Sequence, residues 1–224
     1  MKEFTLPNGL KFIVVERHNA PVFSFETMVN AGGADEQVGQ TGIAHMMEHM
    51  AFKGTSVVGT KDWAQEQSLL EAEERAYLAL RTERQKGLKA DTTKLAALQQ
   101  ALAEAQDAAR GQVESNEFSR IVESAGAPAM NAETSDDVTR YFYSLPSNRL
   151  ELWALMEGGR MTWPVFREFY KERDVVYEER RMGVESSPVG RLVMDFLNTA
   201  FVEHPYRTGV IGVFSFFRAV APVM

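Results

Sequence analysis

The sequence predicts a single α+β domain with a helical insertion. Short runs rich in β-branched and aromatic residues occur near the start of the chain and again around residues 130–145. Segments with apolar residues three and four positions apart, typical of helices, lie between and after these runs. No internal repeat or low-complexity linker divides the 224 residues, a length that suits one large domain or two small ones.

The sequence pattern at the start of the chain predicts three strands. Residues 2–6 and 10–16 form two β-type runs around the Asn8-Gly9 turn, and residues 22–30 form a third. The Gly32-Gly33 pair then ends the strand pattern.

Helical patterns follow, first over residues 41–52 and then over 62–86 and 92–111. The last two stretches, rich in Ala, Glu, Gln and Leu, predict two antiparallel helices within an insertion at residues 62–113. We expect the second of these helices to extend toward residue 126. The hairpin either buries an apolar seam at the surface or serves as an arm for a partner or substrate. Its seam residues are Leu95, Leu98, Leu102, Ala105 and Ala109.

Strand character returns at residues 130–134 and 139–145, joined by a polar turn, and helices are expected over 150–161 and 165–184. The chain ends in a strongly apolar run from Gly209 to Met224. This run is either a buried closing strand or an unnaturally ended segment.

Composition excludes several classes of protein. The formal net charge of −7 and the pI near 5.2 argue against a nucleic-acid or anionic-membrane binder. The absence of cysteine excludes disulfides, thiolate metal sites and cysteine nucleophiles. No apolar run is long enough to span a membrane, and no signal peptide is visible in residues 1–15. These observations leave the compartment undetermined, either periplasmic or secreted, or cytoplasmic.

The pentapeptide His45-Met46-Met47-Glu48-His49 contains half of the four histidines. Two imidazoles one helical turn apart can bind one divalent metal, and the intervening Glu48 lies close enough to act as a general base. The order His-x-x-Glu-His is the inverted form of the common zinc-protease motif. Ordinary surface or capping histidines are the alternative, but apolar neighbours (Ile43, Met46, Met47, Met50 and Phe52) predict a buried helix.

A third ligand is then needed. His18 and His204 fall at a strand end and in a proline-containing turn, where we expect surface residues. Glu172 and Glu179 are seven residues apart on one helical segment and so face the same side. One of them could bind the metal while the other supports a ligand, or both could belong to a charged, solvated helix face.

The segment Gly39–Thr55 closely resembles the active-site helix of the insulinase/pitrilysin metallopeptidases, a family that includes the mitochondrial processing peptidase. Other parts of the chain, spanning roughly residues 3–212, are similar to further elements of this family. These are Leu6-Pro7-Asn8-Gly9-Leu10, Asn131-Ala132-x-Thr134-Ser135 with Tyr141, Glu172-Arg173-Asp174-Val175-Val176 with Glu179, and His204-Pro205-Tyr206.

The resemblance implies a zinc endopeptidase acting on short or unfolded polypeptides, in an α+β sandwich with a mostly antiparallel sheet covered by helices on one side. It implies one Zn²⁺ per chain, bound by His45, His49 and Glu179. Glu48 would be the general base and Glu172 a second acid that supports the ligands. The family's substrate pairs as an added strand along the sheet edge, here at Ala129, Met130, Asn131 and Ala132. His49 and Glu179 are 130 positions apart, longer than the family's usual spacing, and the insertion at 62–113 accounts for the excess.

Two departures from the family pattern suggest alternatives. Family members usually have two such domains or subunits around a peptide chamber, whereas residues 1–224 match only one, and the tail at 213–224 does not resemble the family. The chain is therefore either an active domain or a partner-dependent, non-catalytic half that keeps the zinc site. A homodimer that buries the apolar tail is a further possibility. A serine hydrolase is disfavoured, since no Gly-x-Ser-x-Gly is present.

Overall fold

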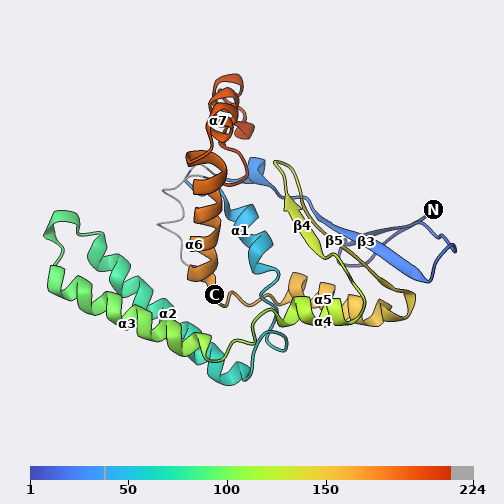
Figure 1. The fold of residues 1–224 in the computed structure, drawn as a ribbon, viewed down its shortest axis with the longest axis horizontal. Coiled ribbons are helices and arrows are strands. Elements are labelled where there is room, and N and C mark those ends of the chain that lie inside the picture. The colour runs from blue at the N-terminus through green and yellow to red at the C-terminus, as the bar shows by residue number, and fades with distance from the viewer. Residues whose placement is uncertain (38, 213–224) are drawn as a thin grey trace.

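A computed structural model describes residues 1–37 and 39–212 and confirms the α+β class (Figure 1). The apolar tail at 213–224, to which the sequence assigned a strand or an unnatural end, lies outside the described residues. In the described part, no helix combines the length and apolar character needed to cross a bilayer. The bounds of the longer elements are β1 Lys2–Thr5, β2 Lys11–Val14, β3 Val22–Val29, α1 Ile43–Met50, α2 Trp63–Arg84, α3 Thr92–Arg110, α4 Glu117–Ser124, β4 Asn131–Thr134, β5 Thr139–Pro146, α5 Leu150–Thr162, α6 Phe169–Arg180 and α7 Pro188–Ala200.

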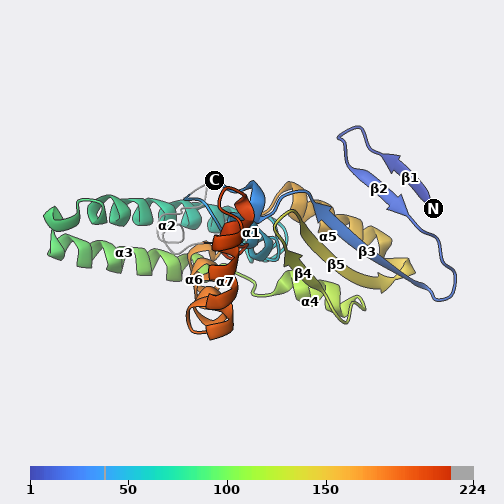
Figure 2. The same ribbon diagram turned by 90° about the horizontal axis from the view of Figure 1, so that it is seen from above.

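The strands form two antiparallel sheets. Strands β1 and β2 pair as a separate hairpin, which projects away from the rest of the molecule in Figure 2. The larger sheet has the order β3-β5-β4, so β5 is its central strand. In β5 the side chains of Thr139, Tyr141, Tyr143 and Leu145 are buried at every second position, as expected for a strand with one covered face.

Helices α4 and α5 cover this buried face of the sheet (Figure 1). Trp153 of α5 packs against Phe23 and Phe25 of β3, and Phe25 contacts Tyr143 edge to face with ring centroids 4.3 Å apart. The core here is formed by buried residues of α4, the loop after it, β5 and α5, namely Phe118, Val122, Ala127, Tyr143, Leu145 and Met156. The expected arrangement of helices on one side of an antiparallel sheet is thus confirmed.

A second core joins the helices that carry the predicted ligands. It consists of Met46 and Met50 of α1, Tyr77 of α2, and Phe169, Tyr170 and Val176 of α6. Met50 and Val176 are fully buried. This core fixes α1 and α6 against each other, and their relative placement determines where the ligand side chains meet.

Helices α2 and α3 form a long antiparallel hairpin that extends away from the sheet (Figures 1 and 2). A bridge between Thr60 and Val113 closes its base. All five predicted seam residues of α3 are at least partly buried, because spacings of three and four place them on the face toward α2. That the hairpin is an insertion stays a prediction.

The helix boundaries differ from the predicted ones in three places. Helix α3 does not continue to residue 126, because the chain turns at 111–116 and α4 begins after Asn116, whose φ of 56° is left-handed. Helix α6 begins at Phe169 rather than at Val165, after Glu168 with the same left-handed φ. Helix α7 was not predicted, although Ser187 followed by Pro188 is a typical helix start, and Ser187 accepts a hydrogen bond from the Gly190 amide.

Candidate metal centre

Helix α1 presents the two histidines at the edge of its buried face. Met46 and Met50 point into the core between α1, α2 and α6, while the neighbouring His45 and His49 side chains remain 17% and 20% exposed. The sequence predicted a buried helix, but α1 is buried only on one side. Ile43 and Met47 are 37% and 39% exposed. The histidines therefore face an accessible space beside the core.

The start of α1 is held by a carboxylate. Glu36 accepts hydrogen bonds from the amides of Gly42 at 2.6 Å and Ala44 at 2.7 Å. These amides have no partner within the helix, so Glu36 takes the place of an N-cap side chain and complements the positive end of the helix dipole. Burial raises the pKa of Glu36, opposed by these amide hydrogen bonds.

Helix α6 brings both predicted acids to the histidines. Oε2 of Glu179 lies 3.6 Å from Nε2 of His45 and 3.7 Å from Nε2 of His49. Oε2 of Glu172 lies 3.5 Å from the other nitrogen of His49, Nδ1. The ligand atoms of His45, His49 and Glu179 all lie within 4.8 Å of one another, and this cluster could hold a metal ion.

The two imidazoles differ in their electrostatic environment. Burial, reinforced by the neighbouring His49, lowers the pKa of His45, so this ring is neutral and can offer a lone pair to a cation. Contact with Glu172 raises the pKa of His49 by more than burial lowers it. Although burial alone would raise the pKa of Glu172, its contacts with His49 and Lys53 lower that pKa to about 2. Glu172 is thus a carboxylate at neutral pH, and its negative charge faces Nδ1 of His49.

Glu48 of α1 contacts the edge strand of the larger sheet, β4. Its Oε2 accepts a hydrogen bond from Oγ1 of Thr134 in β4 at 2.6 Å. Within the described residues, β4 pairs only with β5, which leaves its other edge unpaired beside Glu48. A cavity of about 270 Å³ opens next to Glu48 and His49. A carboxylate, an accessible cavity and an unpaired strand edge therefore adjoin the cluster of His45, His49 and Glu179.

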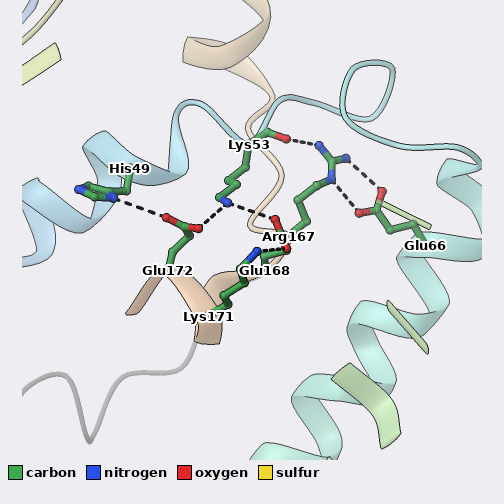
Figure 3. Close-up of polar contacts among 7 residues, drawn as sticks. All are labelled: His49, Lys53, Glu66, Arg167, Glu168, Lys171 and Glu172. Carbon is green, nitrogen blue, oxygen red and sulfur yellow. Dashed lines mark hydrogen bonds and ion pairs between the residues drawn. The ribbon is translucent and has the colours of Figure 1, made fainter. Parts of the chain in front are cut away.

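The turn after α1 is clamped by Arg167. This side chain is 1% exposed and binds both carboxylate oxygens of Glu66 in α2, at 2.7 and 3.1 Å (Figure 3). It also donates to the backbone carbonyls of Lys53, Thr55 and Val58. The turn needs Gly59, whose φ is +91° and where a Cβ atom would lie 2.5 Å from Nη1 of Arg167.

The structure places every predicted site residue. His45, His49 and Glu179 converge, Glu172 lies 3.5 Å from Nδ1 of His49, and Glu48 lies on the same helix as the two histidines. His18 and His204 are exposed, as expected. Ala129 and Asn131 are exposed at the sheet edge, while Met130 and Ala132 are partly buried.

Sequence reasoning missed two residues at the site. Lys53 contacts Glu172, and its position four residues after His49 was the available signal. Thr134 contacts Glu48 across 86 positions, and no local pattern marks such a pair.

Comparisons with known proteins agree with this site. The family model described as Insulinase (Peptidase family M16) matches residues 11–82, which include the histidine pair. The zinc protease PqqE of Helicobacter pylori is 32% identical over 213 residues, covering 93% of this chain and 35% of that protein. The crystal structure of a protease from Helicobacter pylori superposes with a TM-score of 0.68 at 29% identity, over 98% of this chain and 40% of the other.

The periplasmic protease PqqL from Escherichia coli shares the fold, with a TM-score of 0.65 at 19% identity, over 98% of this chain and 19% of that protein. The chain belongs to the insulinase family of zinc proteases, peptidase family M16. It spans about a third of the length of the curated relative and corresponds to a domain-sized portion of these larger proteins.

Proposed function

We propose that this chain is the zinc-binding part of a metalloendopeptidase that hydrolyses peptide bonds in short or unfolded polypeptides. The observation that carries the proposal is the convergence of Nε2 of His45, Nε2 of His49 and Oε2 of Glu179 beside a carboxylate on the same helix. Two imidazoles and one carboxylate are a typical ligand set of catalytic zinc sites, which keep one position open.

Two of the three separations between the candidate ligand atoms are close to those of a zinc site, and all of them are within 4.8 Å. Ligand atoms bound about 2.0–2.1 Å from a tetrahedral zinc lie roughly 3.4 Å apart. The observed separations of 3.6 and 3.7 Å from Glu179 to the two histidines need only a small contraction. When bound, zinc would supply a Lewis acid that makes a water molecule acidic enough to react near neutral pH.

The residues of the chain perform the remaining steps. Glu48 takes the proton of the attacking water and passes it to the leaving amide nitrogen, and Thr134 orients its carboxylate. Glu172 fixes the ring of His49 through Nδ1. The unpaired edge at the start of β4 and the two residues before it, together Ala129–Ala132, pair with the extended backbone of the substrate, which selects unfolded peptides with little sequence preference.

A second candidate is a partner-dependent half-enzyme that keeps the zinc site without turnover of its own. The matched region makes up 35% of the curated relative and 40% of the solved Helicobacter protease, so in those proteins further polypeptide accompanies it. Either a second-half protein or a second copy of the chain would complete the chamber. If the second half supplies a hydrogen-bond donor to the oxyanion that forms during peptide hydrolysis, its absence would slow the reaction a hundred- to thousand-fold, the typical cost of one such donor.

Cleavage of a quenched fluorescent peptide tests both candidates. An active domain predicts turnover that a zinc chelator abolishes, that added zinc restores, and that Glu48→Gln lacks while still binding zinc. If the wild type and Glu48→Gln bind zinc and are equally inert, the isolated chain is not an endopeptidase. Turnover that then appears on adding a second-half protein supports the half-enzyme. A chain that binds no zinc contradicts both.

A further inference from the structure

The ring of His49 is held from both sides by carboxylates of one helix. Nε2 faces Glu179 at 3.7 Å, and Nδ1 faces Glu172 at 3.5 Å. The group on the second nitrogen of a ligating histidine sets the ring orientation and the tautomer. The place of the Glu172 carboxylate therefore determines whether His49 can present Nε2 to a metal.

Glu172 in turn depends on a cation. Its side chain is 13% exposed, and that of Glu168, one helical turn earlier, is 9% exposed. Lys53 lies between them, with Nζ 2.5 Å from Oε1 of Glu172 and 3.1 Å from Oε2 of Glu168 (Figure 3). Two shielded carboxylates one turn apart repel each other, so Glu172 would turn away without the ammonium group.

Lys53 is itself fixed by the fold. Its side chain is 16% exposed, and its backbone carbonyl accepts a hydrogen bond from Arg167. Glu66 of α2 holds Arg167 in place (Figure 3). One series of contacts thus runs from the base of the helical hairpin to His49.

We propose that Lys53 is a positioning residue of the metal centre, whose ammonium group holds Glu172 against Nδ1 of His49 and so keeps Nε2 directed at Glu179. The inference rests on the proposed metal site and deepens it. Lys53 touches neither the ligand atoms nor the substrate and acts only through Glu172.

Zinc affinity of the full chain, measured by competition with a chromophoric chelator, tests the proposal. Lys53→Met keeps an unbranched side chain one heavy atom shorter and removes the charge, and we expect zinc affinity to fall ten- to a hundredfold. Lys171→Met is the matched control, since Lys171 contacts Glu168 at 2.8 Å and not Glu172. Its zinc affinity should stay within twofold of the wild type. The absorption spectrum of bound Co²⁺ should change in Lys53→Met alone.

A double variant tests whether Lys53 acts through Glu172. The zinc affinity of Lys53→Met/Glu172→Gln should equal that of Glu172→Gln alone. Losses that multiply in the double variant, or a Lys53→Met affinity within twofold of the wild type, would overturn the proposal. If Lys53→Met loses the native circular dichroism spectrum, Lys53→Gln carries the same expectation. A wild type that takes up no zinc refutes the metal site itself, whereas equal zinc binding by the wild type and Lys53→Met refutes only the role of Lys53.

Discussion

Neutralising Glu66 should destabilise the whole domain. Glu66 is fully buried and forms two hydrogen bonds with Arg167, itself 1% exposed at its side chain. The substitution Glu66→Gln keeps the volume and leaves a buried guanidinium without its counter-charge. Removing one partner of a buried ion pair costs about 3–5 kcal/mol, and we expect the lower end, about 3 kcal/mol, because Gln still accepts one hydrogen bond.

Urea denaturation followed by circular dichroism measures this loss. With a slope of about 2 kcal/mol per M, a loss of 3 kcal/mol lowers the midpoint by roughly 1.5 M. Glu71→Gln in the same helix is the control, because Glu71 pairs with Arg75 at 3.7 Å and both side chains are at least half exposed. Its loss should be below about 0.5 kcal/mol.

A double variant, Glu66→Leu/Arg167→Met, tests what the whole buried ion pair contributes to stability. Apolar replacement of a buried ion pair is often neutral, but here it would also remove the Arg167 donor from the carbonyls of Lys53 and Thr55, while the Val58 carbonyl keeps the Thr55 amide. We therefore expect the double variant to be no more stable than Glu66→Gln. If Glu66→Gln lost less than 1 kcal/mol, or if the double variant regained wild-type stability, the clamp would not hold the turn after α1.

Three further predictions concern a buried acid, the general base and the metal. Burial raises the pKa of Glu73 to about 7, above its ordinary 4.5, so the folded state holds a proton that the unfolded state loses, and the stability of the fold falls as pH rises from about 4.5 to 7. Relative to the wild type, Glu73→Gln should therefore gain about 2 kcal/mol of unfolding free energy at pH 8 and little at pH 4. An equal gain at both pH values in urea titrations would contradict this. Thr134→Val should lower kcat about tenfold with zinc affinity unchanged, because it removes the short hydrogen bond to Glu48 together with a long one from Thr139, and neither involves a ligand atom. A parallel loss of bound zinc would assign Thr134 to the metal site instead. Zinc in hundredfold excess over its Kd should stabilise the wild type by about 2.7 kcal/mol in thermal melts and leave His49→Ala unchanged; equal stabilisation of both would place the metal elsewhere.

The spacing of residues within single helices predicted much of the candidate site from the sequence alone. The spacing of four between His45 and His49 requires one helix face, and the spacing of seven between Glu172 and Glu179 does the same. The three-and-four spacing in α3 predicted which of its side chains are buried, since the helical period is fixed by backbone geometry. These features depend on neighbours within two or three turns.

Tertiary structure alone decided how those faces meet. Packing of α1 against α6 selects Glu179 rather than Glu172 to face both Nε2 atoms, a choice that their shared helix face left open. The contacts of Thr134 with Glu48 and of Lys53 with Glu172 join residues 86 and 119 positions apart. No sequence period encodes such pairs, because they follow from the relative placement of whole elements, which cooperative core packing determines. The sequence by itself therefore determined which side chains are candidate ligands and which helices carry them, and the tertiary structure determined how these side chains are arranged around the candidate site and which contacts hold them.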